Sequence, residues 1–192
     1  AFNIGGTISN CYNTGEISAG SSTVHCGGIA GGVSEGVLSC CYNSGTVSSI
    51  SPFCAGGICG SNFDSVENCY NTGNIIGEDS AGIVDFNYGS VCNCYSTGVI
   101  SSEDWEYSAG VVYSNVSEDG GVIENCFYLE GSAYAGVIWD GTADSKSETE
   151  MKSGDFAENL NTTGGTSESS GAWTTDADQN DGYPVLTGTS IE

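Results

Sequence analysis

Cysteine is the residue type in this chain with the most scope for chemistry, and five of its ten copies follow a pattern. These five recur every 25 to 32 residues, and an aromatic residue follows each of them: Cys11, Cys41, Cys69, Cys94 and Cys126. Zinc and iron–sulfur sites need much tighter spacing, such as Cys-x-x-Cys. Because free thiols are among the most buried side chains, we interpret the five as a file of core cysteines and not as metal ligands.

Cys26 and Cys54 fall in the same part of successive repeats and are the pair for which we consider a disulfide. Thiols stacked about 5 Å apart with parallel Cβ vectors, as expected in the file above, have poor disulfide geometry. His25, the single histidine, directly precedes Cys26. A catalytic thiol needs a base that is itself oriented by a third group. The sequence offers no such group, so we expect His25 to be a surface residue.

Carboxylates offer a second chemistry, because two of them together can hydrolyse a glycosidic bond. The candidates fall at different positions of their repeats and form no recurring pair: Asp64, Asp85, Glu103, Asp104 and Glu124. Arginine is absent, and Lys146 and Lys152 both lie near the C-terminus, so cations that would hold an acidic polysaccharide are missing from the repeats. We predict that the chain is not an enzyme and has no catalytic residue. The alternative is a polysaccharide-binding or polysaccharide-degrading β-helix protein.

One acidic turn near the C-terminus is a calcium-binding candidate, formed by Asp176, Asp178, Asn180 and Asp181. It resembles half of an EF-hand loop, which requires Gly at its sixth position and Glu at its twelfth. Here Asp181 and Thr187 occupy those two positions, so a solvated acidic turn is the competing interpretation. No other cofactor is predicted.

The elements that would position these residues follow from the repeat around each cysteine. Aliphatic residues stand three positions before it and six after it, asparagine directly before it, an aromatic residue directly after it, and glycine four after it. Cys40 is the exception in the asparagine column. The columns comprise Ile8, Leu38, Val66, Val91 and Ile123; Ile17, Val47, Ile75 and Ile100; Asn10, Asn68, Asn93 and Asn125; Tyr12, Tyr42, Tyr70 and Tyr95; and Gly15, Gly45, Gly73 and Gly98.

A second apolar signature separates these anchors, first as Gly-Gly-Ile-Ala-Gly at 27–31 and then as related segments at 56–60, 81–84, 109–112 and 135–138. Each repeat therefore has three short β-branched pieces divided by Gly, Ser or Asn, which is typical of strands. Self-similarity at a period of about 20–50 residues indicates a stacked repeat fold. We predict an all-β chain that forms a β-solenoid, similar to a parallel β-helix, of about five rungs with three short strands each.

In such a coil equivalent residues stack about 4.8 Å apart, so the cysteine, tyrosine and asparagine columns should form structural ladders. An asparagine amide at a corner can bond the backbone there and the next asparagine, and we expect the column glycines to supply positive φ. Adjacent residues of a strand face opposite sides. We expect the thiols inside and an exposed tyrosine stack outside, with a bent corner that reverses this arrangement as the alternative.

Residues 141–192 break the repeat, so we divide the chain into a solenoid region at 1–140 and a C-terminal cap at 141–192. Helix-forming residues cluster only from Ser147 to Asn161, and Gly154 divides them. Pro184 suits a final edge strand, since it cannot donate to a further strand. An open solenoid end exposes unpaired strand edges, and we expect the cap to cover it.

The balance of charge limits the partners of the chain. Its 25 acidic and two basic residues give a net charge of −23, which repels phosphate backbones and anionic lipids. We predict no nucleic-acid partner, and no membrane span because no apolar run approaches about 18 residues. The chain begins within a repeat, and we interpret it as part of a longer polypeptide whose other domains are its partners.

The segment at 27–31, with Ser39 to Gly45 and its repeats through Cys126, resembles the GLUG-motif repeats of bacterial surface proteins. These occur in adhesins and in non-catalytic regions of IgA-cleaving metallopeptidases. The close of the chain at 182–186, after Trp173, is similar to the end of such regions. Cys40, Cys59 and Asp85 depart from the pattern.

The resemblance implies a β-solenoid segment of a secreted or cell-surface bacterial protein with no activity of its own. On this basis we predict a structural or adhesive repeat segment. It would act as a stiff spacer or present a weakly binding face to host or microbial glycans or proteins.

Overall fold

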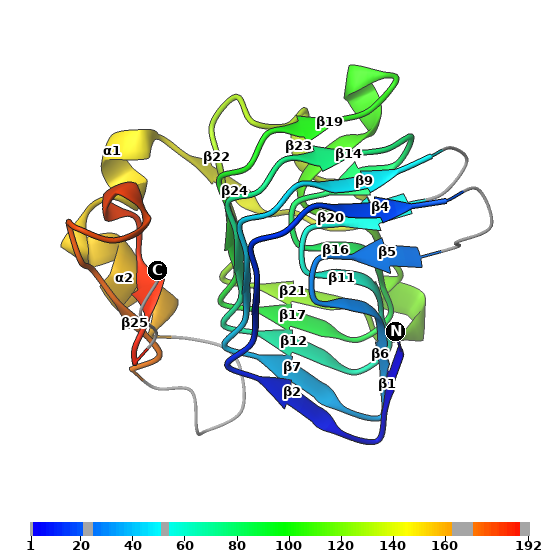
Figure 1. Ribbon diagram of the computed structural model, residues 1–192, viewed down its shortest axis with the longest axis horizontal. Coiled ribbons are helices and arrows are strands. Elements are labelled where there is room, and N and C mark those ends of the chain that lie inside the picture. The colour runs from blue at the N-terminus through cyan, green and yellow to red at the C-terminus, as the bar shows by residue number, and fades with distance from the viewer. Residues whose placement is uncertain (1, 21–24, 51–53, 163–170, 189–192) are drawn as a thin grey trace.

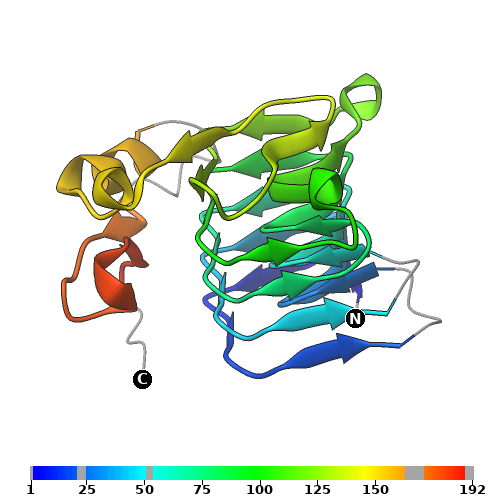
Figure 2. The ribbon, with the colours of Figure 1, turned by 90° about the horizontal axis from the view of Figure 1, so that it is seen from above.

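The computed structural model describes residues 2–20, 25–50, 54–162 and 171–188. The chain coils into about five turns, and equivalent strands of successive turns pair in parallel and in register. Figure 1 shows the stacked turns, and Figure 2 shows that their order along the stack follows the order of the sequence. The predicted all-β solenoid is therefore confirmed.

Four parallel sheets run along the stack and give the turns four sides. The nine-stranded sheet contains β1 (Phe2–Ile4), β5 (His25–Gly27), β6 (Ala30–Ser34), β10 (Cys54–Gly56), β11 (Cys59–Asn62), β15 (Ser80–Ala81), β16 (Val84–Asn87), β20 (Ser108–Asn115) and β23 (Ala135–Trp139). The five-stranded sheet contains β2 (Thr7–Ser9), β7 (Val37–Ser39), β12 (Ser65–Glu67), β17 (Ser90–Cys92) and β21 (Val122–Glu124).

The other two parallel sheets carry the tyrosine column and the buried aliphatic column that stands six residues after each cysteine. The six-stranded sheet contains β3 (Tyr12–Asn13), β8 (Tyr42–Asn43), β13 (Tyr70–Asn71), β18 (Tyr95–Ser96), β22 (Phe127–Leu129) and β24 (Asp144–Lys146). The four-stranded sheet contains β4 (Ile17–Ala19), β9 (Val47–Ser49), β14 (Ile75–Ile76) and β19 (Ile100–Ser101). The short helices η1 (Trp105–Tyr107) and η2 (Ser117–Asp119) flank β20.

A complete turn has more strands than the three expected. The turn from β10 to β14 contains five, because corners interrupt the apolar pieces that the sequence presents as continuous. One such corner falls at Asn68, whose φ of 53° lies in the left-handed region and separates β12 from β13. A residue in that conformation ends a strand and redirects the chain.

The interior of the coil is filled by the aliphatic and cysteine columns. Leu38, Val66 and Val91 are fully buried there, together with the cysteines that follow them. The isoleucines of the second signature, such as Ile58 and Ile83, complete the same core. Each turn buries these side chains largely against the turns beside it, so the core is shared along the stack.

The column glycines have a different role from the one expected. Gly45, Gly73 and Gly98 do not have positive φ; asparagine takes that conformation instead. A Cβ atom on any of the three would overlap the carbonyl oxygen of the glycine one turn earlier in the chain. These glycines are therefore required because two backbones approach too closely for a side chain to fit.

The segment after residue 140 contains the short helices expected, but most of it lies beside the stack and does not cover an open end. β24 still pairs with β22, after which come α1 (Glu148–Met151), α2 (Gly154–Leu160), β25 (Trp173–Thr174), η3 (Asn180–Gly182) and β26 (Val185–Leu186). β25 and β26 form an antiparallel pair. Figure 2 shows this yellow-to-red segment along one flank of the solenoid. No helix in the described ranges is long and apolar enough to span a bilayer.

The close approach of the glycine backbones can be tested with one added methyl group. Gly98→Ala would place a Cβ against the Gly73 carbonyl, and we expect it to lower the free energy of unfolding by about 3 kcal/mol. Gly154→Ala is the matched control, because nothing lies within 4 Å of its added Cβ. Urea unfolding followed by circular dichroism measures both, and equal midpoints for the two variants would contradict this interpretation.

Candidate functional site

The cysteine file is present and faces the interior, as predicted. Cys41, Cys69 and Cys94 are completely buried, and the sulfur of Cys94 lies 3.4 Å from the backbone nitrogen of Cys69. Each thiol also donates to the carbonyl two residues before it, as Cys94 does to Cys92 at 3.1 Å. The thiols thus act as small apolar side chains that also satisfy a backbone acceptor next to the corner.

Burial makes these thiols poor nucleophiles. Removal from water raises the pKa of Cys69, Cys94 and Cys126 well above that of an ordinary thiol, because the thiolate cannot be solvated in the core. Among the described residues, no three His, Cys, Asp or Glu side chains come together in a group that could hold a metal ion.

The asparagine column occupies the left-handed corner before each cysteine. Its φ values run from 50° to 54°, and asparagine tolerates this conformation better than most residues. Asn125 donates to Asn93 across one turn at 2.8 Å, which is the ladder bond expected. Cys40 has a φ of 51° but carries no amide, and the side-chain nitrogen of Asn68 in the next turn is buried without a hydrogen-bond partner.

A more continuous amide ladder lies two residues after each cysteine and was missed by the sequence analysis. Asn13 donates to Asn43 at 2.7 Å, Asn43 to Asn71 at 2.8 Å, and Asn71 to the hydroxyl of Ser96 at 3.3 Å. In the last full turn Tyr128 takes this position and packs against the interior core. The recurring Tyr-Asn pair was the signal that could have revealed this ladder.

A third amide ladder runs along another corner of the coil and consists of Asn62, Asn87 and Asn115. Asn62 donates to Asn87 at 2.8 Å, and Asn87 donates to Asn115 at 2.7 Å. Asn115 then donates to the backbone carbonyl of Asp140 at 2.8 Å. This ladder was also missed, since Val33 occupies the equivalent position in the turn before Asn62 and interrupts the column.

The tyrosine column forms a parallel ring stack on the outside of the coil, as expected. Ring centroids are 5.2 Å apart between Tyr12 and Tyr42, 5.0 Å between Tyr42 and Tyr70, and 5.3 Å between Tyr70 and Tyr95. The expectation of an exposed stack is wrong for three of the four rings, because Tyr42, Tyr70 and Tyr95 are at most 2% exposed. Only Tyr12 remains open, at 61%.

The C-terminal segment covers this stack. The apolar side chains that pack on the rings are Met151, Phe156, Ala157, Leu160, Trp173, Tyr183 and Leu186. Phe156 meets Tyr95 and Phe127 edge to face, and the Trp173 indole lies against Tyr70 and Tyr95. Because the cysteines face inward, the tyrosine that follows each of them faces outward. The cover therefore shields this apolar face of stacked rings from water.

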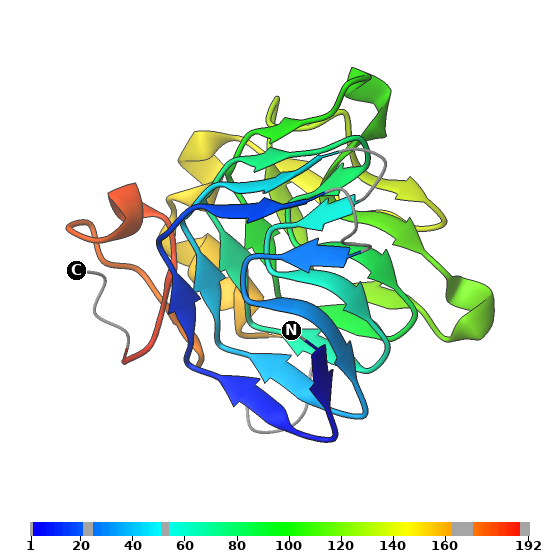
Figure 3. The same ribbon diagram turned by 45° about the vertical axis from the view of Figure 1, so that its right-hand side comes forward.

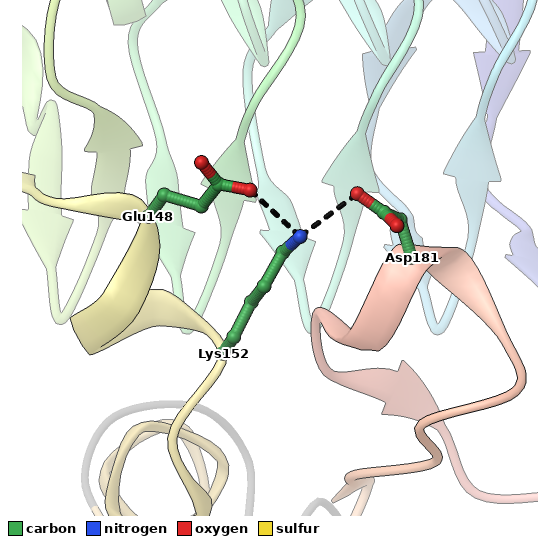
Figure 4. Close-up of polar contacts among 3 residues, drawn as sticks. All are labelled: Glu148, Lys152 and Asp181. Atoms are coloured by element: carbon green, nitrogen blue, oxygen red, sulfur yellow. Dashed lines mark hydrogen bonds and ion pairs between the residues drawn. The ribbon is translucent and has the colours of Figure 1, made fainter.

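Polar contacts hold this cover in place. The Tyr95 hydroxyl donates to the carbonyl of Pro184 and accepts from the amide of Asn180 at 2.8 Å. Lys152 joins two parts of the cover, with its Nζ atom 2.7 Å from Glu148 and 2.8 Å from Asp181 (Figure 4). Its ammonium also lies 4.7 Å from the centre of the Tyr183 ring. These bonds to Asp181 and Glu148 raise the pKa of Lys152.

The calcium candidates are engaged within this cover. Asp176 accepts from the Asp178 backbone at 3.0 Å and from Gln179 at 2.6 Å. Asn180 points its amide nitrogen toward Tyr95, and Asp181 binds Lys152. The Lys152 ammonium and hydrogen-bond donors of the turn thus occupy oxygens that a calcium ion would need.

Of the carboxylate candidates, Asp64, Glu103, Asp104 and Glu124 are exposed, and Asp85 is buried with 0% exposure. An acidic and aromatic cluster that includes Asp79 and Tyr113 lies on the outer side of the nine-stranded sheet. The sequence analysis missed it. Asp79 bonds Tyr113, and burial raises the pKa of both groups.

Phe86 links this cluster to His25 through an edge-to-face contact with centroids 5.9 Å apart. Burial lowers the pKa of His25. Since Asp85 is shielded from solvent, it cannot reach a polysaccharide in this structure.

The proposed disulfide partners are offset by one residue along their paired strands. The register places Cys26 beside Ala55 and Cys54 beside His25. Cys26 is a free, buried thiol in this structure, and the side chain of Cys54 lies outside the described residues.

One comparison with known proteins agrees with this architecture. The GLUG motif matches residues 51–76, a segment that runs from β10 to β14 and makes one full turn. The match covers this one turn, and together with the β-solenoid fold it fits a GLUG-repeat β-helix. The comparison with curated proteins gave no match, and neither did the comparison with solved structures.

The corner at Cys40 offers a test of the asparagine column. Cys40→Asn should raise the free energy of unfolding by about 1–2 kcal/mol, because asparagine suits the left-handed corner and offers the buried Asn68 nitrogen an acceptor. Cys40→Ala, which provides neither, is the control and should not stabilise the solenoid. Chemical denaturation measures both, and a stabilisation shared by the two variants would contradict the ladder explanation.

The orientation of the thiols can be tested by their reactivity. In the native protein at pH 8, Cys11 should react with iodoacetamide at least roughly tenfold faster than Cys69 or Cys94, because Cys11 is exposed and the other two are buried with raised pKa. Peptide mapping by mass spectrometry follows each site. In urea the three rates should converge, and fast native labelling of Cys94 would place that thiol outside.

Proposed function

We propose that this GLUG-repeat solenoid is a rigid structural module of a secreted or cell-surface bacterial protein and is not an enzyme. The observation that carries the proposal is the continuity of its ladders. Backbone pairing, amide bonds and ring stacking all run in register from one turn to the next. A chain tied in this way resists bending, since any bend would break several columns at once.

Two further features support a role outside the cytoplasm. The GLUG motif is associated with extracellular bacterial proteins. The net charge of −23 also keeps the surface well hydrated and discourages self-association. As a module of a larger protein, the solenoid would position neighbouring domains and would present its exposed sides to host or microbial surfaces.

Single-molecule force spectroscopy tests the mechanical role. The chain is placed between marker domains of known unfolding force and pulled from its ends. A rigid module should lengthen only after a distinct force peak, with contour length released in steps. A Gly/Ser linker of equal length is the control, and smooth extension like that of the linker would rule out this role.

Antibodies raised against the folded chain test the location. They should bind intact cells of the source bacterium, or the culture medium, without permeabilisation. Signal that depends on permeabilisation would place the protein inside the cell and overturn this part of the proposal.

Exposed aromatic residues favour glycan binding as a second candidate function. Trp105 and Tyr107 on η1 and Tyr134 before β23 are all exposed, and the Tyr134 amide donates to the carbonyl of Ser108 beside η1. Amphipathic rings of this kind are common in recognition surfaces. On a glycan array, binding should be lost in a Trp105→Ala, Tyr134→Ala double variant and retained in Ile76→Ala, whose exposed side chain lies on β14. Equal binding by both variants would remove this candidate.

A further inference from the structure

A cavity of about 390 Å³ lies where the last turn of the solenoid meets the C-terminal segment. Figure 3, like Figure 2, shows this yellow-green turn at the end of the stack away from the blue first turn. Residues of β21, β22, β24 and α2 contribute to its walls, so the coil and its cover form it together. Cavities that bind small molecules have volumes of about 300–1,000 Å³, and this one falls within that range.

One wall of the cavity is the end of the asparagine ladder that precedes the cysteines. Asn125 donates through Nδ2 to Oδ1 of Asn93 at 2.8 Å and to the carbonyl of Asn159 at 2.9 Å. These two bonds use both hydrogens of the amide nitrogen. Oδ1 of Asn125 accepts no hydrogen bond from the described residues, whereas the equivalent oxygen of Asn93 accepts from Asn125. Asn125 thus brings an unused acceptor to the cavity.

Thr142 is the reason that the ladder stops here. Phe127 pairs with Asp144, so Thr142, two residues earlier, lies level with Asn125. Threonine has a shorter side chain than asparagine and no amide to continue the column. Thr142 and Asn125 both line the cavity, which therefore opens where another side-chain amide would continue the ladder.

Lys146 lies on a second wall and brings unused donors to the cavity. Its ammonium lies 5.5 Å from the centre of the Phe127 ring. In the part of the chain that the structure describes, the carboxylates within ion-pair distance of a lysine all belong to Lys152, and no acceptor takes a hydrogen bond from Lys146. A secondary amide carries one N–H donor and one carbonyl acceptor, so it can satisfy Asn125 and Lys146 together.

The charges around the cavity favour an uncharged ligand. Asp144 lines it, and a neighbouring cavity of about 240 Å³, which shares Lys146, is lined by Glu150 and Asp155. In a chain of net charge −23, these carboxylates beside one ammonium repel an anion. Carboxylate oxygens only accept hydrogen bonds, and they match the hydroxyl donors of a sugar ring. A polypeptide backbone carries the same amide but no hydroxyl groups for these acceptors.

We propose that this cavity binds the acetamido group of a neutral N-acetyl amino sugar. The acetamido N–H donates to Asn125 Oδ1, and the acetamido carbonyl accepts from Lys146 Nζ. The methyl group packs against Ile123, whose side chain also lines the cavity. The sugar ring extends past Lys146 into the neighbouring cavity, where its hydroxyls donate to Asp155.

Titration of the intact chain with N-acetylglucosamine, followed by NMR of the side-chain amides, tests this site. The Asn125 signals should shift and saturate, and binding should be at least about tenfold tighter than that of glucose, which lacks the acetamido group. N-acetylneuraminic acid keeps that group but adds a carboxylate, so it should bind at least about tenfold more weakly than N-acetylglucosamine. Equal binding of either comparison sugar, or no saturable shift at Asn125, would overturn the proposal.

A peptide that carries Nε-acetyllysine and is blocked at both ends separates the two sources of an acetamido group. It lacks the ring hydroxyls that donate to Asp155, so it should bind at least about fivefold more weakly than N-acetylglucosamine. Equal or tighter binding of the peptide would overturn the proposal in favour of an acetylated protein as the ligand.

Substitutions at the two walls test the assigned contacts. Thr142→Asn places an amide beside Asn125 and continues the ladder into the cavity, so it should weaken N-acetylglucosamine binding at least about tenfold without lowering the unfolding midpoint. Thr142→Ser keeps the hydroxyl and the space, and as the matched control it should bind like the original chain. Lys146→Met keeps an apolar contact with Phe127 but removes the donors, and it should also lose about tenfold in affinity. Unchanged affinity in Thr142→Asn or Lys146→Met, or a loss in Thr142→Ser, would contradict these contacts and the proposal with them.

This site depends neither on the mechanical role nor on the glycan-binding candidate at η1, with which it shares no residue. The Trp105→Ala, Tyr134→Ala double variant should therefore keep the full Asn125 shift, even if it loses binding on the array. Loss of the Asn125 shift in the double variant would place the sugar at η1 and overturn the assignment to this cavity.

Discussion

The parallel hydrogen bonds between successive turns fix the spacing that every column in this protein must accept. Strands paired in this way lie about 4.8 Å apart, and the tyrosine rings stack at 5.0 to 5.3 Å because the backbone holds them there. The same spacing brings the glycine carbonyls of successive turns so close that no Cβ fits between them. Amide ladders suit this constraint, since an asparagine both donates to and accepts from copies of itself placed one strand apart.

The left-handed residue directly before each column cysteine connects this constraint to the chemistry of the sequence. The corner at Asn68, or at Cys40 in the turn before it, redirects the strand. The carbonyl two residues before the following cysteine accepts one bond from the corner amide of the turn before, as Glu67 does from Cys40 at 3.2 Å, and can accept a second. The thiol of that cysteine donates to the carbonyl, as Cys69 does to Glu67 at 3.3 Å. Cysteine thus fills a small apolar space and satisfies an acceptor, which neither alanine nor valine could do. The column is explained by packing and bonding, without any need for reactivity.

Much of the fold could be predicted from periodicity, and the errors have identifiable physical causes. The repeat spacing indicates stacking, and alternation along the strand places Cys69 inside and Tyr70 outside. Backbone φ is not visible in a sequence, so asparagine was interpreted only as a ladder residue and glycine as the left-handed residue. In the structure asparagine takes the left-handed corner. The column glycines are needed because successive turns lie too close together for a side chain. The position of the C-terminal cover was missed because residues after 146 carry no repeat. A physical signal was nevertheless present, since an outward column of aromatic rings requires apolar partners, and Phe156 and Trp173 are among the few large apolar residues of that segment.

The reach of this cover explains why the ring stack is buried along most of its length and open at one end. Contacts begin at Phe127, where Phe156 packs, and continue along the stack to Tyr70, where Trp173 packs and donates to Asn68. Tyr42 still joins this apolar cluster, but Tyr12 does not. The cover is tied to the middle of the stack by the bonds of Tyr95, and Lys152 holds its two parts together, so neither set of contacts extends to the first turn. The cover thus protects the flank of the coil from Phe127 to Tyr42, and the Tyr12 ring lies outside it.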